Sequence, residues 1–175
     1  MSKLTPAKTL LKIQKIKYKF LAVPIIVIIL TFLLNLKYEN KIFSIISLIA
    51  LVIFFVISRI FSVNKSVHNP EKSGKILAPI NGKIVKKQRN ELIIKKSIFA
   101  HAEIRKSDKE NKLALSIKGF LLYDFAEEDA VQAQIIGLLP GPATAVCQLP
   151  ENYHFTVEET ENIEAGETVI AELGQ

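Results

Sequence analysis

Two long apolar runs dominate the first third of the chain, and short alternating segments follow them. Residues 20–36 (FLAVPIIVIILTFLLNL) carry no charge, and residues 42–58 (IFSIISLIALVIFFVIS) repeat that length after a five-residue polar gap. Each run reaches the lower limit for a helix that crosses the hydrocarbon of a bilayer. The remaining chain is too small to cover two core helices of this kind. The sequence therefore predicts a transmembrane helical hairpin over residues 20–61.

The charges flanking these runs predict an orientation. A cleaved signal peptide is the alternative for the first run, but no small-residue cleavage site follows it and a second run comes at once. The link KYENK allows only a tight antiparallel turn, so both ends of the chain lie on one side. Cations are more numerous outside this link (Lys3, Lys8, Lys12, Lys15, Lys17, Lys19, Arg59, Lys65 and Lys72) than within it (Lys37 and Lys41). The positive-inside rule predicts cytoplasmic termini.

This reasoning predicts an integral membrane protein with a cytoplasmic domain. The richness in lysine and isoleucine favours a bacterial inner membrane, with an organellar membrane as the alternative. The formal net charge of +6 is a poor sign of nucleic-acid binding, because the positive excess adjoins the membrane. We therefore expect no nucleic-acid partner.

The first 19 residues form a basic amphipathic segment. Thr5-Pro6 is typical of a helix start, and apolar side chains recur among six lysines, at Leu10, Leu11, Ile13 and Ile16. Such a helix can rest on anionic headgroups, where each lysine contributes about 1 kcal/mol. It can equally be a flank that only sets topology.

The pattern changes at residues 62–74, a polar stretch with Asn-Pro and Ser-Gly that is typical of a linker. Residues 75–175 then read as short strands separated by turns, and they predict an all-β sandwich or barrel. The expected strands are 75–78, 83–88, 91–96, 99–105, 113–117, 120–125, 131–138, 143–149, 154–157 and 168–173.

Charge divides this predicted β domain into halves. Residues 75–118 hold 12 Lys or Arg and 4 Asp or Glu, whereas residues 119–175 hold 11 acids and no Lys or Arg. The basic half can face lipid headgroups with the acidic half turned to the cytosol, or the halves can interleave and neutralise each other across strands. In the first case the lipid-binding residues are Lys83, Lys86, Lys87, Arg89, Lys95 and Lys96.

The cysteine and the histidines predict no metal site. Cys147 is alone, which excludes an internal disulfide within this sequence and permits a reducing compartment. His68, His101 and His154 are dispersed without the spacing of metal ligands.

Two stretches carry a family resemblance. "NPEKSGKILAPINGKIV" (69–85) resembles the entry to the β domain of phosphatidylserine decarboxylases, which contains a Pro-Ala-Asp-Gly-Lys-Val element. "IGLLPGPATAVCQLP" (136–150) and "VEETENIEAGETVIAEL" (157–173) resemble the closing region of the same family. The two-span N-terminus also fits its short bacterial form. The resemblance implies a hammerhead β fold; biotinyl and lipoyl carrier barrels and membrane adaptors share parts of this pattern.

This resemblance implies a known chemistry. Family members are proenzymes in which a serine hydroxyl attacks the preceding carbonyl, and the ester eliminates to leave an N-terminal pyruvoyl group. That carbonyl forms a Schiff base with the substrate amine and acts as an electron sink during loss of CO₂. An Asp and a His assist the cleavage.

The residues that this chemistry requires are missing. Gap-free alignment places Ala143 at the serine and Pro142 at the preceding glycine; alternatively, "QIIG" (134–137) matches an upstream element and the cleavage segment is deleted. Asn81 replaces the family Asp, although Asn-Gly also favours a type I′ turn. The histidine hairpin has no counterpart, and nothing around His101 matches it. We therefore expect no catalytic residues, with Asn81 and Ala143 as vacated positions, and no pyruvoyl cofactor.

The sequence thus predicts a membrane-anchored relative of phosphatidylserine decarboxylases that is not an enzyme. It would bind anionic phospholipid, or serve as a scaffold or regulatory partner of a protein such as a paralogous decarboxylase. One alternative is an active decarboxylase that makes phosphatidylethanolamine through an unrecognised residue. Another is a membrane adaptor with a biotinyl- or lipoyl-like barrel.

Overall fold

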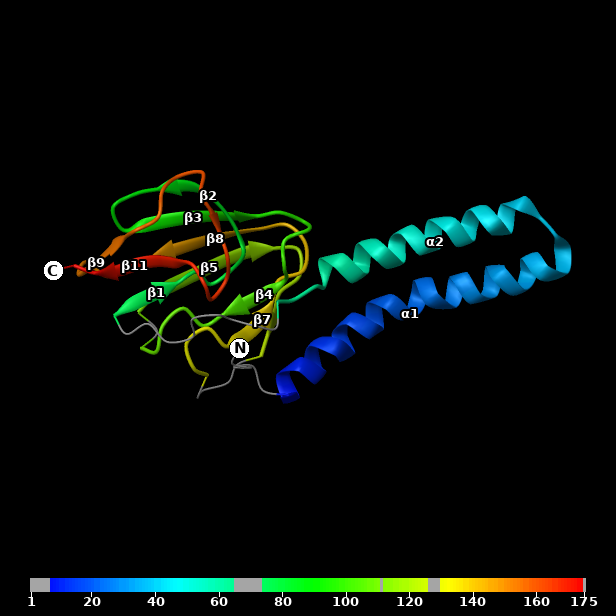
Figure 1. Ribbon diagram of the computed structural model, residues 1–175, viewed down its shortest axis with the longest axis horizontal. Helices are drawn as coiled ribbons and strands as arrows, with labels where there is room; N and C mark the ends of the chain where they lie inside the picture. Colours follow the sequence, from blue (N-terminus) through cyan, green and yellow to red (C-terminus); the bar gives the residue numbers. More distant parts are fainter. Residues whose placement is uncertain (1–6, 65–73, 111, 126–129, 175) are drawn as a thin grey trace.

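A computed structural model describes residues 7–64, 74–110, 112–125 and 130–174 of the chain. Two helices, α1 (Ala7–Tyr38) and α2 (Lys41–Ile60), precede a β-rich domain (Figure 1). Its strands are β1 (Lys75–Leu77), β2 (Gly82–Lys87), β3 (Glu91–Lys96), β4 (Glu103–Arg105), β5 (Ala114–Gly119), β6 (Tyr123–Asp124), β7 (Ile135–Leu138), β8 (Ala143–Gln148), β9 (Tyr153–Phe155), β10 (Asn162–Ile163) and β11 (Val169–Leu173).

The two helices form an antiparallel hairpin that extends away from the β domain (Figure 1). Both are long and apolar enough to cross a membrane, and most of their large apolar side chains are exposed. The α2 helix has 20 residues, which at 1.5 Å per residue is about 30 Å, the thickness of bilayer hydrocarbon. It starts where Asn40 Oδ1 accepts a hydrogen bond from Ile42 N at 3.0 Å.

The predicted N-terminal segment of residues 1–19 is not separate from the first span. From Ala7 onward it belongs to α1, which continues without a break to Tyr38. Its apolar stripe, Leu10, Ile13 and Ile16, packs against the β domain, where it meets Ala102, Phe125, Ile135 and Leu138. The expectation that this stripe rests on headgroups is therefore corrected: Ile13 is buried against protein.

The strands form three sheets, and the described strands do not close into a barrel. The largest sheet has five strands in the order β10-β2-β3-β8-β5, and two three-stranded sheets have the orders β1-β11-β9 and β4-β7-β6. The prediction of a β-rich domain after an apolar helical hairpin is confirmed at this level.

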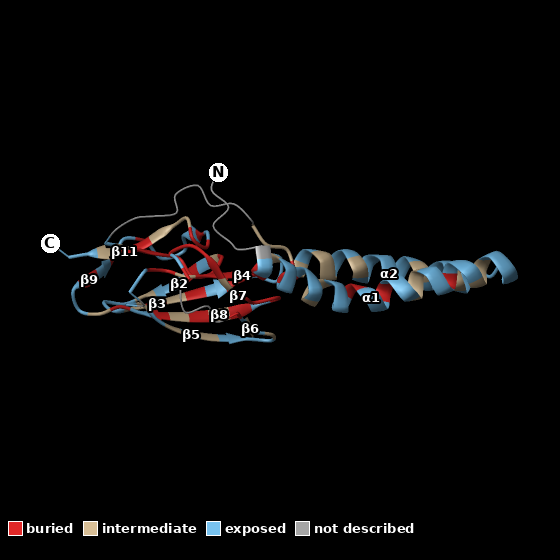
Figure 2. Cartoon of the chain, turned by 90° about the horizontal axis from the view of Figure 1, so that it is seen from below, coloured by how far each residue is buried: buried red, intermediate tan, exposed pale blue. Residues whose placement is uncertain are grey.

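The main core lies between the five-stranded sheet and the β1-β11-β9 sheet. Alternate residues of β3 and β8 point into it, so Leu92, Ile94, Ala145 and Cys147 are fully buried while Lys95 is exposed. Ile76, Tyr153, Phe155, Ile170 and Ala171 cover them from the other side. Figure 2 shows this division, with buried strands inside the domain and exposed surface along the helices.

The two charged halves of the β domain interleave. The acidic-half strand β8 lies between the basic-half strands β3 and β5, and β11 pairs with β1. Lys75 Nζ and Glu172 Oε1 form an ion pair of 2.6 Å across that second pair of strands. Of the two arrangements left open by the sequence, the separation of a basic from an acidic side is wrong.

The start of the predicted linker is bound to the β domain. Ala102 N donates to Ser62 O at 2.7 Å, and Asn64 N donates to Glu103 Oε2 at 3.2 Å. These bonds hold the end of α2 against β4. Most of the remaining predicted linker, residues 65–73, lies outside the described residues.

Candidate functional site

The positions that the resemblance marks as vacated lie at the same end of the five-stranded sheet. Asn81 directly precedes β2, and Ala143 is the first residue of β8, on the other side of β3. Lys96, the last residue of β3, pairs with Ala143, which also pairs with Gly119 of β5. With strands about 4.8 Å apart, β3 separates the two positions by roughly 10 Å. The end of β3 thus stands between them.

The side chain of Asn81 is engaged in structural hydrogen bonds. Its Nδ2 donates to Glu103 Oε1 at 3.0 Å and to His101 O at 3.4 Å, and its Oδ1 accepts from Ala165 N at 3.0 Å. The type I′ turn expected for Asn81-Gly82 is wrong: that turn needs φ > 0 at both residues, neither has it, and Gly82 already belongs to β2. The amide instead joins β4 to the 164–166 turn.

Lys96 is buried, so its predicted contact with lipid headgroups is corrected. Strand alternation places Leu92, Ile94 and Lys96 on the inner face of β3, and Lys96 is 1% exposed. Its Nζ donates to the carbonyl oxygens of Gly141 at 2.9 Å and Ala100 at 3.0 Å. Burial lowers the pKa of Lys96 to about 8, opposed by the negative charge of Glu103.

Sequence reasoning missed two further buried charges, Glu103 and Arg105 of β4. Glu103 accepts hydrogen bonds from Asn81 and from Asn64 N, and Arg105 donates to Ala133 O at 2.7 Å and Asn64 O at 2.5 Å. Burial lowers the pKa of Arg105, opposed by Glu103. Among the described residues, Arg105 Nε is a buried nitrogen without a hydrogen-bond partner. Nothing in the pattern of β4 marked these side chains as buried.

The other predicted lipid-binding cations do not lie together at the helix end. Lys83 and Lys95 are exposed cross-strand partners near that end. Lys86 lies further along β2, and Lys87 Nζ contacts Glu158 Oε1 at 3.4 Å. Arg89 belongs to the β2–β3 turn, at the end of the domain away from the helices (Figure 1). Of the six, only Lys83 and Lys95 are both exposed and close to the helices.

A cleft of about 420 Å³ opens where the two helices meet the β domain. Apolar side chains form most of its wall, and Lys17 with a few neutral polar groups forms the rest. The lining residues are Leu10, Ile13, Gln14, Lys17, Tyr18, Leu21, Phe54, Ser58, Phe61, Ser62 and Val63. An apolar wall with one cation matches a phospholipid, in which apolar acyl chains adjoin a headgroup that carries a phosphate.

Ser62, on the wall of this cleft, is joined to His101, with 3.2 Å between Ser62 Oγ and His101 Nδ1. The contact ties the end of α2 to the loop before β4. In the described part of the chain, no carboxylate bonds to this histidine ring to complete a nucleophilic triad. Within the same residues, no group of three His, Cys, Asp or Glu side chains is placed to hold a metal ion.

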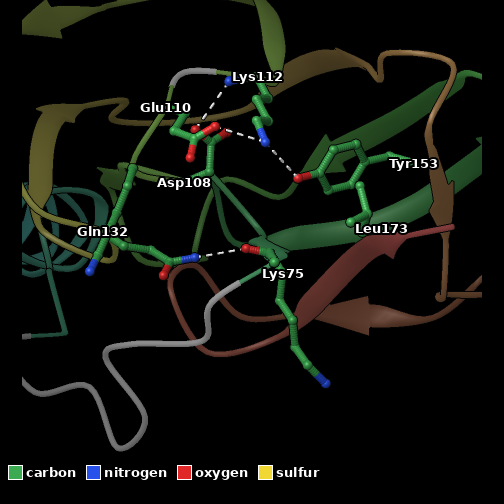
Figure 3. Close-up of a pocket in the computed structure, with 9 residues that line it drawn as sticks. Lys75, Asp108, Glu110, Lys112, Gln132, Tyr153 and Leu173 are labelled. Carbon is green, nitrogen blue, oxygen red and sulfur yellow. Dashed lines mark hydrogen bonds and ion pairs between the residues drawn. The ribbon is translucent and has the colours of Figure 1, made fainter. Parts of the chain in front are cut away.

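A smaller cavity of about 230 Å³ is lined by Lys75 at the start of β1 and Leu173 at the end of β11, among others (Figure 3). These strand ends lie at the end of the domain away from the helices (Figure 1). Its polar side chains bond to one another or to the adjacent backbone. Lys112 Nζ contacts Glu110 Oε2 at 2.8 Å and Tyr153 Oη at 3.1 Å, and Gln132 Nε2 donates to Lys75 O at 2.9 Å. This cavity is far from Asn81 and Ala143 and contains neither.

Comparison with family models, with curated proteins and with solved structures finds no match to this chain. The assignment of a function therefore depends on the geometry described above and on the resemblance of short segments.

Proposed function

We propose that this chain is a membrane-anchored, non-catalytic relative of phosphatidylserine decarboxylases that binds anionic phospholipid from the cytoplasmic side of a bacterial inner membrane. One observation carries the proposal: the apolar helices leave the β domain at the same end at which Asn81 and Ala143 lie (Figure 1). With the helices in a membrane, the end of the domain that carries these two positions would adjoin the lipid, where a phospholipid ligand resides.

The chemistry at this end supports binding without turnover. A methyl group occupies position 143, and Lys96 Nζ bonds to the carbonyl of Gly141 on the preceding loop. The Asn81 amide bonds to Glu103, His101 and Ala165. No hydroxyl therefore stands at the aligned nucleophile position, and removal of an activated nucleophile costs many orders of magnitude in rate.

The cleft between the helices supports phospholipid as the ligand. It lies at the level where α1 and α2 leave the apolar spans, and it presents Lys17 beside walls such as Leu21 and Phe54. A lipid there would place an acyl chain between the helices and its phosphate near Lys17. The cation and the neutral polar groups favour an anionic headgroup over a zwitterionic one.

Nanodiscs that contain the full chain test this function. The discs contain phosphatidylcholine with a minor fraction of phosphatidylserine. After mild detergent release, mass spectrometry identifies the lipid that the protein retains, and the ratio of the two lipids is compared with their ratio in the disc. We expect enrichment of phosphatidylserine, reduced in Lys17→Gln but not in the control Lys37→Gln at the opposite end of α1. Equal retention of both lipids by the unaltered chain would contradict phospholipid selectivity and favour a protein partner.

A further inference from the structure

Two loops leave the five-stranded sheet at the end that faces the helices. The register places Lys96, Ala143 and Gly119 side by side at this end of β3, β8 and β5. The chain continues from β3 into residues 97–102 and from β5 into residues 120–122. The hydrogen bond from Ala102 N to Ser62 O fixes the first loop beside the end of α2. Figure 1 shows this end of the sheet at the base of the helical hairpin.

The tips of these two loops expose large apolar side chains. Phe99 is 52% exposed and Phe120 86% exposed, and Ile98 and Leu122 accompany them at 40% and 53%. An apolar group of this size on the surface of a water-facing domain marks a contact with another apolar phase or partner. Here the apolar spans of α1 and α2 begin at the same end.

A row of lysines lies behind these tips, each one residue in from the end of its strand. Lys95 pairs with Thr144, which pairs with Lys118 on its other side, and Lys95 also pairs with Lys83. Residues that pair directly across neighbouring strands point to the same face. All three lysines are exposed, so they form a basic row across β2, β3 and β5.

We propose that this end of the β domain is a second membrane contact, in which Ile98, Phe99, Phe120 and Leu122 enter the lipid interface. Lys83, Lys95 and Lys118 then lie at the level of the phosphates and contact anionic headgroups. Apolar tips below a basic row match the layers of a bilayer surface, with acyl chains below phosphates. The inference rests on the proposed membrane anchoring, and it is independent of the cleft and of descent from decarboxylases.

Depth-dependent quenching tests the insertion. Full-length Phe99→Cys and Phe120→Cys are labelled with an environment-sensitive fluorophore and placed in phosphatidylcholine–phosphatidylserine vesicles that contain a lipid spin-labelled near the headgroup. Native Cys147 does not interfere, because it is buried and its pKa is raised to about 12. Leu173→Cys, 48% exposed at the opposite end of the domain, is the matched control.

Quenching at positions 99 and 120 but not at 173 is the expected result. A label at Ile29→Cys, an exposed position near the middle of the apolar run 20–36, separates this proposal from the anchoring. If position 29 is quenched by a lipid spin-labelled near the end of its acyl chain but positions 99 and 120 stay unquenched, the anchoring stands and the surface contact is overturned. If position 29 is not quenched either, both are overturned.

Lipid association tests the basic row. The lipids in contact with the protein are measured for their preference for spin-labelled phosphatidylserine over phosphatidylcholine. The triple variant K83Q, K95Q, K118Q is compared with the unaltered chain. The preference should fall by up to about fivefold for each cation, the ratio that corresponds to about 1 kcal/mol per lysine near an anionic surface. The charge-matched control R89Q, K109Q, K112Q, at the opposite end, should not change it. Equal effects of the two triples would overturn the headgroup contact.

Discussion

At the scale of single residues, the polar side chains at the end of the β domain that faces the helices stabilise the domain. Asn81 donates one hydrogen bond to the buried carboxylate of Glu103 and accepts another from Ala165 N. An amide can do both, whereas an ionised aspartate can only accept. An asparagine, rather than the aspartate of the motif that this segment resembles, therefore suits a position beside Glu103.

Asn81→Asp should destabilise the domain near neutral pH. The new carboxylate would face Glu103, and two carboxylates at hydrogen-bond distance raise the pKa of one of them. We expect a loss of about 1–3 kcal/mol at pH 7, decreasing as the pH falls through that raised pKa because the protonated acid can donate again. Thermal unfolding followed by circular dichroism measures this.

The exposed turn residue Asn152 supplies the control for that substitution, as Asn152→Asp. If the N81D variant is as stable at pH 7 as the unaltered domain, the buried carboxylate of Glu103 does not need the hydrogen bond from the Asn81 amide. The double variant N81D, A143S should also remain uncleaved, because β3 lies between positions 81 and 143 and separates them by roughly 10 Å.

Lys96 should make stability depend on pH in the alkaline range. Its pKa is lowered from 10.5 to about 8 in the folded chain, so between these values the unfolded chain binds more protons. Stability therefore rises with pH over this window, by about 3 kcal/mol. Lys96→Met should lose this rise, and the exposed neighbour variant Lys95→Met should keep it. A rise of equal size in both variants would exclude Lys96 as its source.

At the scale of elements, α1 combines an apolar stretch long enough to cross a membrane with a contact to the β domain. The sequence showed the apolar stripe of Leu10, Ile13 and Ile16, but the partner of the stripe could not be predicted from it. An amphipathic helix can pack on a headgroup layer or on a sheet such as β4-β7-β6. Which of the two it contacts depends on residues far away in the sequence.

Ile13→Ala should loosen the join between the helices and the β domain. Ile13 is 4% exposed, and truncation of a buried isoleucine costs about 2–5 kcal/mol. Leu11→Ala, at an exposed position two residues earlier, is the control and should change little. The unfolding temperature of the β domain and protease cleavage near Ser62 would report the change. Equal stability of the two variants would contradict the packing of α1 on this domain.

Strand positions were largely predictable, whereas their partners were not. Alternation predicted β3 over Glu91–Lys96 with its observed bounds, and the same alternation could have placed Lys96 inside. The expected strand 99–105 is only β4 (Glu103–Arg105), because residues 97–100 form a turn with exposed apolar side chains. β10 (Asn162–Ile163) is too short for any period to reveal. The position of β8 between β3 and β5 depends on long-range pairing that no local pattern encodes.

The candidate site of Asn81 and Ala143 was likewise predictable only in part, because it also depends on contacts between residues distant in sequence. Asn81 and Ala143 could be singled out from the sequence, since each differs from the family motif it resembles. Their positions on either side of β3, and the buried charges of Glu103 and Arg105 nearby, follow only from the folded arrangement. From the sequence alone, a Glu and an Arg are expected at the surface, because such side chains are buried only where they have hydrogen-bond or ion-pair partners.

At the scale of the whole molecule, the helical hairpin and the β domain are joined by direct contacts. Ser62 and Asn64 at the end of α2 bond to Ala102, Glu103 and Arg105, and the α1 stripe packs on the same region. The β domain is therefore held at the base of the two apolar helices. This arrangement suits the proposed function, in which the domain binds the lipid surface that the helices cross.

The central claim is that a lipid-facing β domain of decarboxylase type persists without its reactive group. The intact mass of the full chain, purified from membranes, tests it most directly. We predict one unbroken chain of 19.6 kDa with an ordinary amino terminus. Two fragments divided next to Ala143, the second blocked by a carbonyl group, would contradict the account.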